Sequence, residues 1–224
     1  MSSATGVTGA EPPMRAWKFL ESGRIAPFGG HVWPTPAGGV PGEWRRFPGR
    51  EVFACRIVDL PWWIAPELWE IELEAPVRAL DTQLAAHAGR LIRRVVAWDS
   101  AVLRAYGVAC AERARGLAVE ALTRDGRVEE AQALTRARSM LELSRVARGF
   151  CADARQRVSS NLAAYVAESS MRASESAAAA AANIAANATV AALGDPTAFD
   201  RERQWQAQWI SERAGLSPVP LAAV

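Results

Sequence analysis

Apolar and polar residues alternate most regularly between positions 68 and 73 of the chain. Trp69, Ile71 and Leu73 fall on one side of this alternation, whereas Glu70 and Glu72 fall on the other. A period of two places successive side chains on opposite faces of an extended backbone. The pattern therefore predicts a β-strand whose tryptophan face is buried and whose glutamate face is exposed to solvent.

Shorter apolar segments predict further strands in the first hundred residues. They cover positions 14–20, 52–55, 77–84 and 91–98. Repeated glycines and prolines between positions 21 and 50 predict a series of turns. Asp59 resembles a helix N-cap and Pro61 a residue of the first turn, so one or two helical turns are expected there.

The pattern changes at Asp99, after which no proline occurs until Pro196. Alanine, leucine, arginine and glutamate dominate this stretch, and all of them favour helices. Helices are expected over about 99–125, 128–148 and 150–193, and the third could run unbroken through the alanine-rich segment.

Capping residues mark the ends of the predicted helices. Asp99 is the expected N-cap of the first helix, and Gly194 the expected C-terminal cap of the third. A last helix is expected to begin at Asp195 and to end at Gly215.

These elements predict an α+β fold, in which a small Trp-rich segment containing strands precedes a mainly helical bundle rich in alanine and arginine. We expect a disordered tail over 1–13, a Trp-rich α+β module over 14–98, a helical region over 99–216 and a loose tail over 217–224. The apolar faces of the long helices need cover, so the two main parts are expected to pack on each other.

Composition narrows the class of protein. Half of the 224 residues are hydrophobic, which is enough for a packed core, and the formal net charge is only +2. So small a charge gives little attraction for nucleic acid. No apolar run approaches the ~20 residues of a membrane span, and the first residues lack a signal-peptide pattern. We therefore expect a cytoplasmic protein that does not bind membranes. Nucleic-acid binding is not favoured, and it would require the arginines to cluster on one surface.

The basic residues and the cysteines give little indication of an anion-binding, disulfide or metal site. Lys18 is the only lysine among 26 lysines and arginines, which indicates either an arginine-lined anion surface or the codon usage of a GC-rich genome. Acidic residues interspersed among the arginines favour ion pairs on helix surfaces. Cys55, Cys110 and Cys151 are odd in number and far apart, so neither a disulfide nor a metal site is expected, and no cofactor motif occurs.

Five residues form the candidate ligand-binding site. His31, Trp33 and Trp44 lie in the loop-rich segment near several arginines, where an aromatic groove could bind a ligand. Glu70 and Glu72 could supply carboxylates, and their Glu-x-Glu spacing is similar to the acidic motif of ADP-ribosyltransferases. The alternative is that the tryptophans fill a small core and the glutamates form a solvated strand face. No catalytic residue is assigned.

The alanine-rich segment suggests a different function. Small side chains, with Asn183 and Asn187 among them, allow close approach of another helix, either in a homo-oligomer or partner protein or inside the same bundle. We therefore expect a non-enzymatic interaction or scaffold protein that associates through its long helices. The alternative is a ligand-binding module or enzyme whose site lies in the Trp-, Gly- and Pro-rich first segment.

Several motifs also resemble one family. MRAWKFL at 14–20, DLPWWI at 59–64, ELWEIEL at 67–73 and GRLIRRVVAWD at 89–99 are similar to the N-terminal region of a protein family of unknown function from actinobacteria and phages. WQAQWISERAGL at 205–216 is similar to that family's ending. Members often carry a histidine at the position of Phe53. The resemblance implies the two-part architecture and no particular activity.

Overall fold

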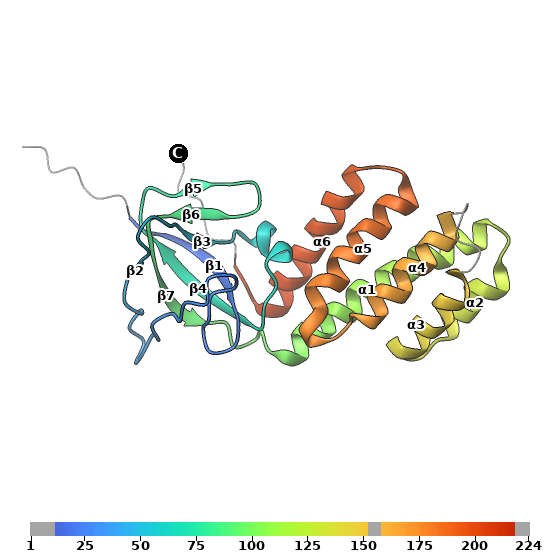
Figure 1. Cartoon of the computed structure of the whole chain (residues 1–224), viewed down its shortest axis with the longest axis horizontal. Coiled ribbons are helices and arrows are strands. Elements are labelled where there is room, and N and C mark those ends of the chain that lie inside the picture. The colour runs from blue at the N-terminus through green and yellow to red at the C-terminus, as the bar shows by residue number, and fades with distance from the viewer. Residues whose placement is uncertain (1–11, 152–157, 218–224) are drawn as a thin grey trace, which may run out of the picture.

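The chain has the predicted α+β fold. The computed structural model describes residues 12–151 and 158–217. Antiparallel strands gather at one end of the molecule, and the helices that follow them form the other end (Figure 1).

Two small sheets make up the strand region. The first has the order β1-β4-β7-β2 and the second the order β3-β6-β5. Their bounds are β1 (Met14–Leu20), β2 (Arg45–Arg46), β3 (Val52–Ala54), β4 (Glu67–Leu73), β5 (Arg78–Ala79), β6 (Leu84–Ala86) and β7 (Ala88–Arg94). Main-chain hydrogen bonds of 2.9 and 2.6 Å between Trp17 and Cys55 link the free edge of β1 to the residue after β3. The segment over 77–84, predicted as a strand with a turn at Asp81, forms β5, a turn and the first residue of β6.

The N-cap of the short helix η1 (Ile57–Trp62) is Arg56, three residues before the predicted N-cap Asp59. The carboxylate of Asp59 accepts hydrogen bonds from the main-chain nitrogen of Arg56 at 2.9 Å and from its guanidinium at 2.7 and 2.8 Å. Asp59 therefore closes the first turn from its third position. The N-cap prediction was wrong because the acidic residue reaches back to the main chain that precedes it.

The helical region contains α1 (Ser100–Arg124), α2 (Val128–Arg136), α3 (Met140–Gly149), α4 (Val158–Met171), the short η3 (Glu175–Ala177), α5 (Ala178–Leu193) and α6 (Thr197–Ala214). The Asp99 carboxylate accepts a hydrogen bond of 2.8 Å from the nitrogen of Val102, which confirms it as the N-cap of α1. Gly194 and Gly215 end α5 and α6 in the left-handed conformation, as predicted.

Two of the predicted helices are divided. The helix expected over 128–148 breaks after Arg136, and Ser139 caps α3 by accepting from the nitrogen of Glu142 at 3.1 Å. The helix expected over 150–193 is interrupted between Met171 and Ala178; the part of that range at 152–157 lies outside the described residues. The break lets α5 turn back and pack against both α4 and α1, which buries its small side chains.

One hydrophobic core continues from the strands into the helices. Trp98 lies at the junction, fully buried, with its indole N–H donating to the carbonyl of Ala65 at 3.1 Å. Its ring meets Phe19 of β1 edge-on at 5.4 Å between centroids and lies 6.3 Å from Tyr106 of α1. A second cluster, within the strand region, gathers around Trp33, Trp69 and Leu91.

The close packing of the bundle depends on a small residue in α1. A Cβ atom at Gly107 would lie 3.2 Å from the Cα of Ala173 and 3.5 Å from that of Ala178. The exposed Gly116 of the same helix has open space around it. The linker between α4 and α5 thus approaches α1 where no side chain separates them.

These two glycines give a matched test of the packing. Gly116→Ala should stabilise the protein by up to about 1 kcal/mol, because alanine favours helices. Gly107→Ala gains the same propensity but overpacks the interface, which typically costs about 1–3 kcal/mol. Urea unfolding followed by circular dichroism should therefore show Gly107→Ala to be the less stable variant by about 1–3 kcal/mol. Equal stabilisation by both would contradict the close approach of α1 to Ala173.

Candidate functional site

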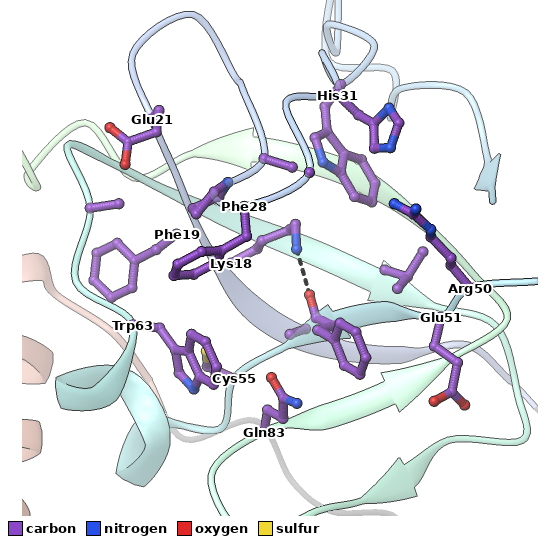
Figure 2. A pocket seen from close by; sticks show the side chains of 18 of the residues that line it. Lys18, Phe19, Glu21, Phe28, His31, Arg50, Glu51, Cys55, Trp63 and Gln83 are labelled. Atoms are coloured by element: carbon purple, nitrogen blue, oxygen red, sulfur yellow. Dashed lines mark hydrogen bonds between the residues drawn. The ribbon is translucent and has the colours of Figure 1, made fainter.

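A pocket of about 800 Å³ opens in the strand region (Figure 2). Its walls come from β1, β3, η1 with the residues just after it, and the loop over 21–33. Ala179 at the start of α5 also lines it. The volume falls within the range typical of small-molecule sites.

Lys18 points into this pocket from the middle of β1 (Figure 2). Its ammonium nitrogen donates a hydrogen bond of 2.6 Å to the carbonyl oxygen of Phe53 and lies 5.2 Å from the ring centroid of Trp33. Burial lowers the pKa of Lys18 from 10.5 to about 8, and the nearby Cys55 opposes this shift weakly. Burial has this effect because a site of low polarity disfavours the charged form of an amine.

The loop over 21–33 holds an aromatic side chain above the pocket. Main-chain hydrogen bonds from Ala26 to the oxygen of His31 at 2.8 Å, and from Gly30 to the oxygen of Ala26 at 3.0 Å, close a tight turn. Phe28 lies in this turn with a left-handed backbone, at a φ of 64°, and its side chain is 98% exposed. Such a conformation costs a residue with a Cβ about 1–3 kcal/mol and is concentrated at functional sites.

Exposed aromatic residues are concentrated at this pocket. In the described part of the chain four phenylalanine and tryptophan side chains are exposed, namely Phe28, Trp44, Phe53 and Trp62, and all but Trp44 line it. Exposed apolar groups that cluster in one place mark interaction sites, whereas scattered ones need no explanation.

The other charged side chains around the pocket include both positive and negative groups. Arg50 and His31 lie on one side of the opening and Glu21 and Glu51 elsewhere around it (Figure 2). Glu51 is paired with Arg78 of β5 at 2.8 Å. The lining therefore holds two carboxylates besides its lysine and its arginine, with no strong excess of either charge.

Cys55 lies at the base of the pocket with its thiol buried. Burial raises the pKa of this thiol to about 12, although the positive charge of Lys18 partly opposes the effect. The thiol is therefore protonated at neutral pH, and protonated thiols are poor nucleophiles. The amine of Lys18 is the stronger nucleophile of the two.

The structure separates the five candidate site residues. His31 and Trp33 line the pocket, Trp33 as part of its buried wall. Trp44, Glu70 and Glu72 do not line it. Trp44 instead stacks on the guanidinium of Arg90 at 4.7 Å from the ring centroid.

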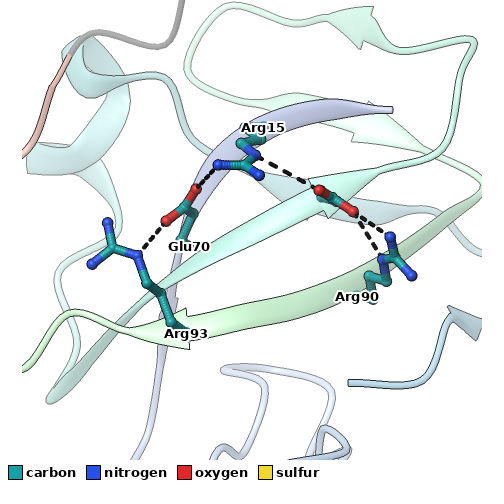
Figure 3. Close-up of polar contacts among 5 residues, drawn as sticks. Arg15, Glu70, Arg90 and Arg93 are labelled. Carbon is teal, nitrogen blue, oxygen red and sulfur yellow. Dashed lines mark hydrogen bonds and ion pairs between the residues drawn. The ribbon is translucent and has the colours of Figure 1, made fainter. Parts of the chain in front are cut away.

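Glu70 and Glu72 form a network with three arginines (Figure 3). Arg15 of β1 lies between them, 3.1 Å from Glu70 and 3.6 Å from Glu72. Arg93 and Arg90 of β7 complete the network at 2.7 Å from Glu70 and Glu72 respectively. The prediction of a solvent-exposed glutamate face was wrong, since both residues are less than 9% exposed. The arginines of the flanking strands cover the carboxylates and occupy their hydrogen-bonding positions.

Sequence reasoning missed four residues of the site: Lys18, Phe28, Phe53 and Trp62. The sequence contained one usable signal, the single lysine in a chain whose other cationic side chains are arginines. The aromatic residues gave none, because only the fold brings their widely separated positions to one opening.

Comparison with known proteins adds no further assignment. No protein-family model, curated protein or solved structure matches the chain. Among the described residues, no helix is long and apolar enough to cross a membrane, and no group of three or more potential ligands is placed to hold a metal ion.

The lowered pKa of Lys18 can be measured directly, because the chain has no other lysine. Trace acetylation with acetic anhydride, quantified on the Lys18 peptide by mass spectrometry, should give a rate that levels off above about pH 8. In 8 M urea, where the amine is hydrated, the rate should continue to rise toward the ordinary lysine value near 10.5. Identical profiles in both conditions would show that the folded pocket does not desolvate the amine.

The ion network should contribute to stability and leave the pocket unaffected. Glu70→Gln removes the partner of two arginines whose side chains are 56% and 66% exposed and can return to water. We expect a loss of about 1.5 kcal/mol in the free energy of unfolding, at the low end for charged hydrogen bonds. Glu43→Gln, at an exposed position, should change it by less than about 0.5 kcal/mol. Loss of ligand binding in Glu70→Gln would instead point to a role in the site.

Proposed function

We propose that this chain binds a small, neutral, mainly apolar molecule with an aromatic or conjugated system. The observation that carries the proposal is the pocket beside Lys18, which is lined by three of the four phenylalanine and tryptophan side chains that are exposed among the described residues. Aromatic rings that stay in water in the free protein gain contact area when a flat apolar ligand covers them.

The balance of charges supports a neutral ligand. The lining holds two cationic side chains, Lys18 and Arg50, and two acidic ones, Glu21 and Glu51, of which Glu51 is paired with Arg78, so the net charge around the pocket is small. A single polar group on the ligand would find the amine of Lys18 within the apolar lining. This arrangement, apolar walls with few polar groups, is typical of small-molecule sites.

The alanine-rich helix gives little support to the scaffold function expected from the sequence. The alanines at 178, 181, 182, 185, 186 and 188 of α5 are buried, and α5 packs against α1, α4 and α6. The small-residue surface that suggested self-association is thus largely covered within the chain.

A neutral fluorescent probe, N-phenyl-1-naphthylamine, tests the proposal. Trp62 and Trp44 are matched, because they are 41% and 37% exposed and stack on arginines at 4.5 and 4.7 Å. Trp62→Leu should weaken probe binding about 3- to 10-fold, the effect of losing about 1 kcal/mol of aromatic contact. Trp44→Leu should leave it unchanged within twofold.

Urea unfolding should first show that both variants have nearly the same unfolding midpoint as the wild-type chain. Absence of saturable binding to the wild-type chain, or equal weakening by both substitutions, would refute the assignment of this pocket as the binding site.

A further inference from the structure

We propose that Lys18 forms a Schiff base with an aldehyde or ketone group of the molecule bound in this pocket. The inference rests on the proposed function, because the carbonyl compound must first occupy the space beside the aromatic rim. It adds a reactive group to the ligand class and a covalent step to the binding.

The surroundings of Lys18 suit an amine nucleophile. Its nitrogen is anchored by the hydrogen bond that it donates to the carbonyl of Phe53 at 2.6 Å. In the neutral amine this bond uses one N–H and leaves the lone pair for attack on a carbonyl carbon. With a pKa of about 8, roughly a quarter of the amine is neutral at pH 7.5. An arginine at this position could not do so, since its guanidinium keeps its proton.

The covalent step balances without an added oxidant or reductant. The lone pair of the neutral amine forms a C–N bond to the carbonyl carbon, and the carbonyl oxygen takes up a proton to give a carbinolamine. The nitrogen then forms the C=N double bond as the C–O bond breaks, and the oxygen leaves as water with the two protons that the nitrogen loses over the two steps. Addition of water reverses both steps and releases the carbonyl compound, so the adduct is reversible.

Two features of the pocket favour the adduct once it forms. Trp33 lies 5.2 Å from the lysine nitrogen, and the face of an indole ring stabilises a nearby cation such as a protonated imine. Phe28 and Phe53 lie around the opening, where a bound ring would contact them and limit the access of water. Water is the reagent that would return the imine to the free amine.

The experiment uses cinnamaldehyde as the probe and cyanoborohydride as the trap. The hydride adds to the imine carbon and a solvent proton to the nitrogen, which fixes the adduct as a secondary amine. The expressed chain has one other kind of primary amine, the α-amino group at its start, whose ordinary pKa is also about 8. Mass spectrometry of the digested protein compares the two sites within one molecule. We expect Lys18 to be labelled at least 10-fold faster than the α-amino group.

Substitutions then show whether the pocket causes the difference. Phe28 and Val96 are both exposed apolar residues, at 98% and 81%, but only Phe28 lines the pocket. Phe28→Ala should slow labelling of Lys18 at least fivefold, whereas Val96→Ala should leave it unchanged. Cinnamyl alcohol, which has no carbonyl group, should protect Lys18 by occupying the same space.

Labelling of Lys18 that is no faster than labelling of the α-amino group would overturn the inference, as would equal effects of the two substitutions. If N-phenyl-1-naphthylamine still binds in a Trp62-dependent manner in that case, the proposed function stands and only the Schiff base fails. If that probe does not bind either, both proposals fail.

Discussion

The alternation of side chains along β1 is the constraint on which the rest of the structure depends. Successive residues of a strand must face opposite sides of the sheet. Phe19 therefore packs on Trp98 and the helical core while it also forms part of the pocket wall, whereas Lys18, one residue away, places its ammonium group near the carbonyl of Phe53 and the ring of Trp33. The hydrogen bonds between Trp17 and Cys55 hold this strand against the end of β3 and bring the carbonyl of Phe53 to the lysine. A shift of the strand by one residue would exchange these two environments.

This constraint explains why a charged side chain is found among apolar ones. The fully buried Leu20 and the buried aromatic residues Trp17 and Phe19 fix the register of β1, and with it the position of Lys18 beside the pocket. The lysine lowers the cost of its position in two ways, by donating to a main-chain carbonyl and by lying over an indole ring. These two contacts do not fully offset the desolvation of the ammonium group, and the pKa of Lys18 is therefore lowered. The same desolvation that weakens the charged form makes the neutral amine available at moderate pH.

Sequence reasoning succeeded where local pattern decides the structure and failed where distant residues decide it. The strand over 67–73 and the N-cap at Asp99 were predictable, because alternation and capping act over a few residues. The burial of Glu70 was not, because its cover comes from Arg15 and Arg93 on neighbouring strands. The break between α4 and α5 was also hidden, since no glycine or proline marks it and packing against α1 determines where the chain turns back. In the site itself, Lys18 contacts the carbonyl of Phe53, which lies 35 positions further along the chain. The pattern of apolar and polar residues does not indicate a contact over such a distance.

The helical region contributes to the pocket by fixing one of its walls. Arg203 of α6 is buried beneath η1, where its guanidinium lies 4.5 Å from the ring centroid of Trp62 and 5.1 Å from that of Phe199. It donates to the carbonyl of Pro61 at 3.2 Å and to the side chain of Asn183 in α5 at 2.8 Å. One side chain thus ties α5, α6 and η1 together directly behind the rim residue Trp62. Because buried polar contacts of this kind are costly to break, the helical bundle holds the aromatic wall at Trp62 in place. The position of this part of the pocket therefore depends on contacts from the helices as well as on the strands.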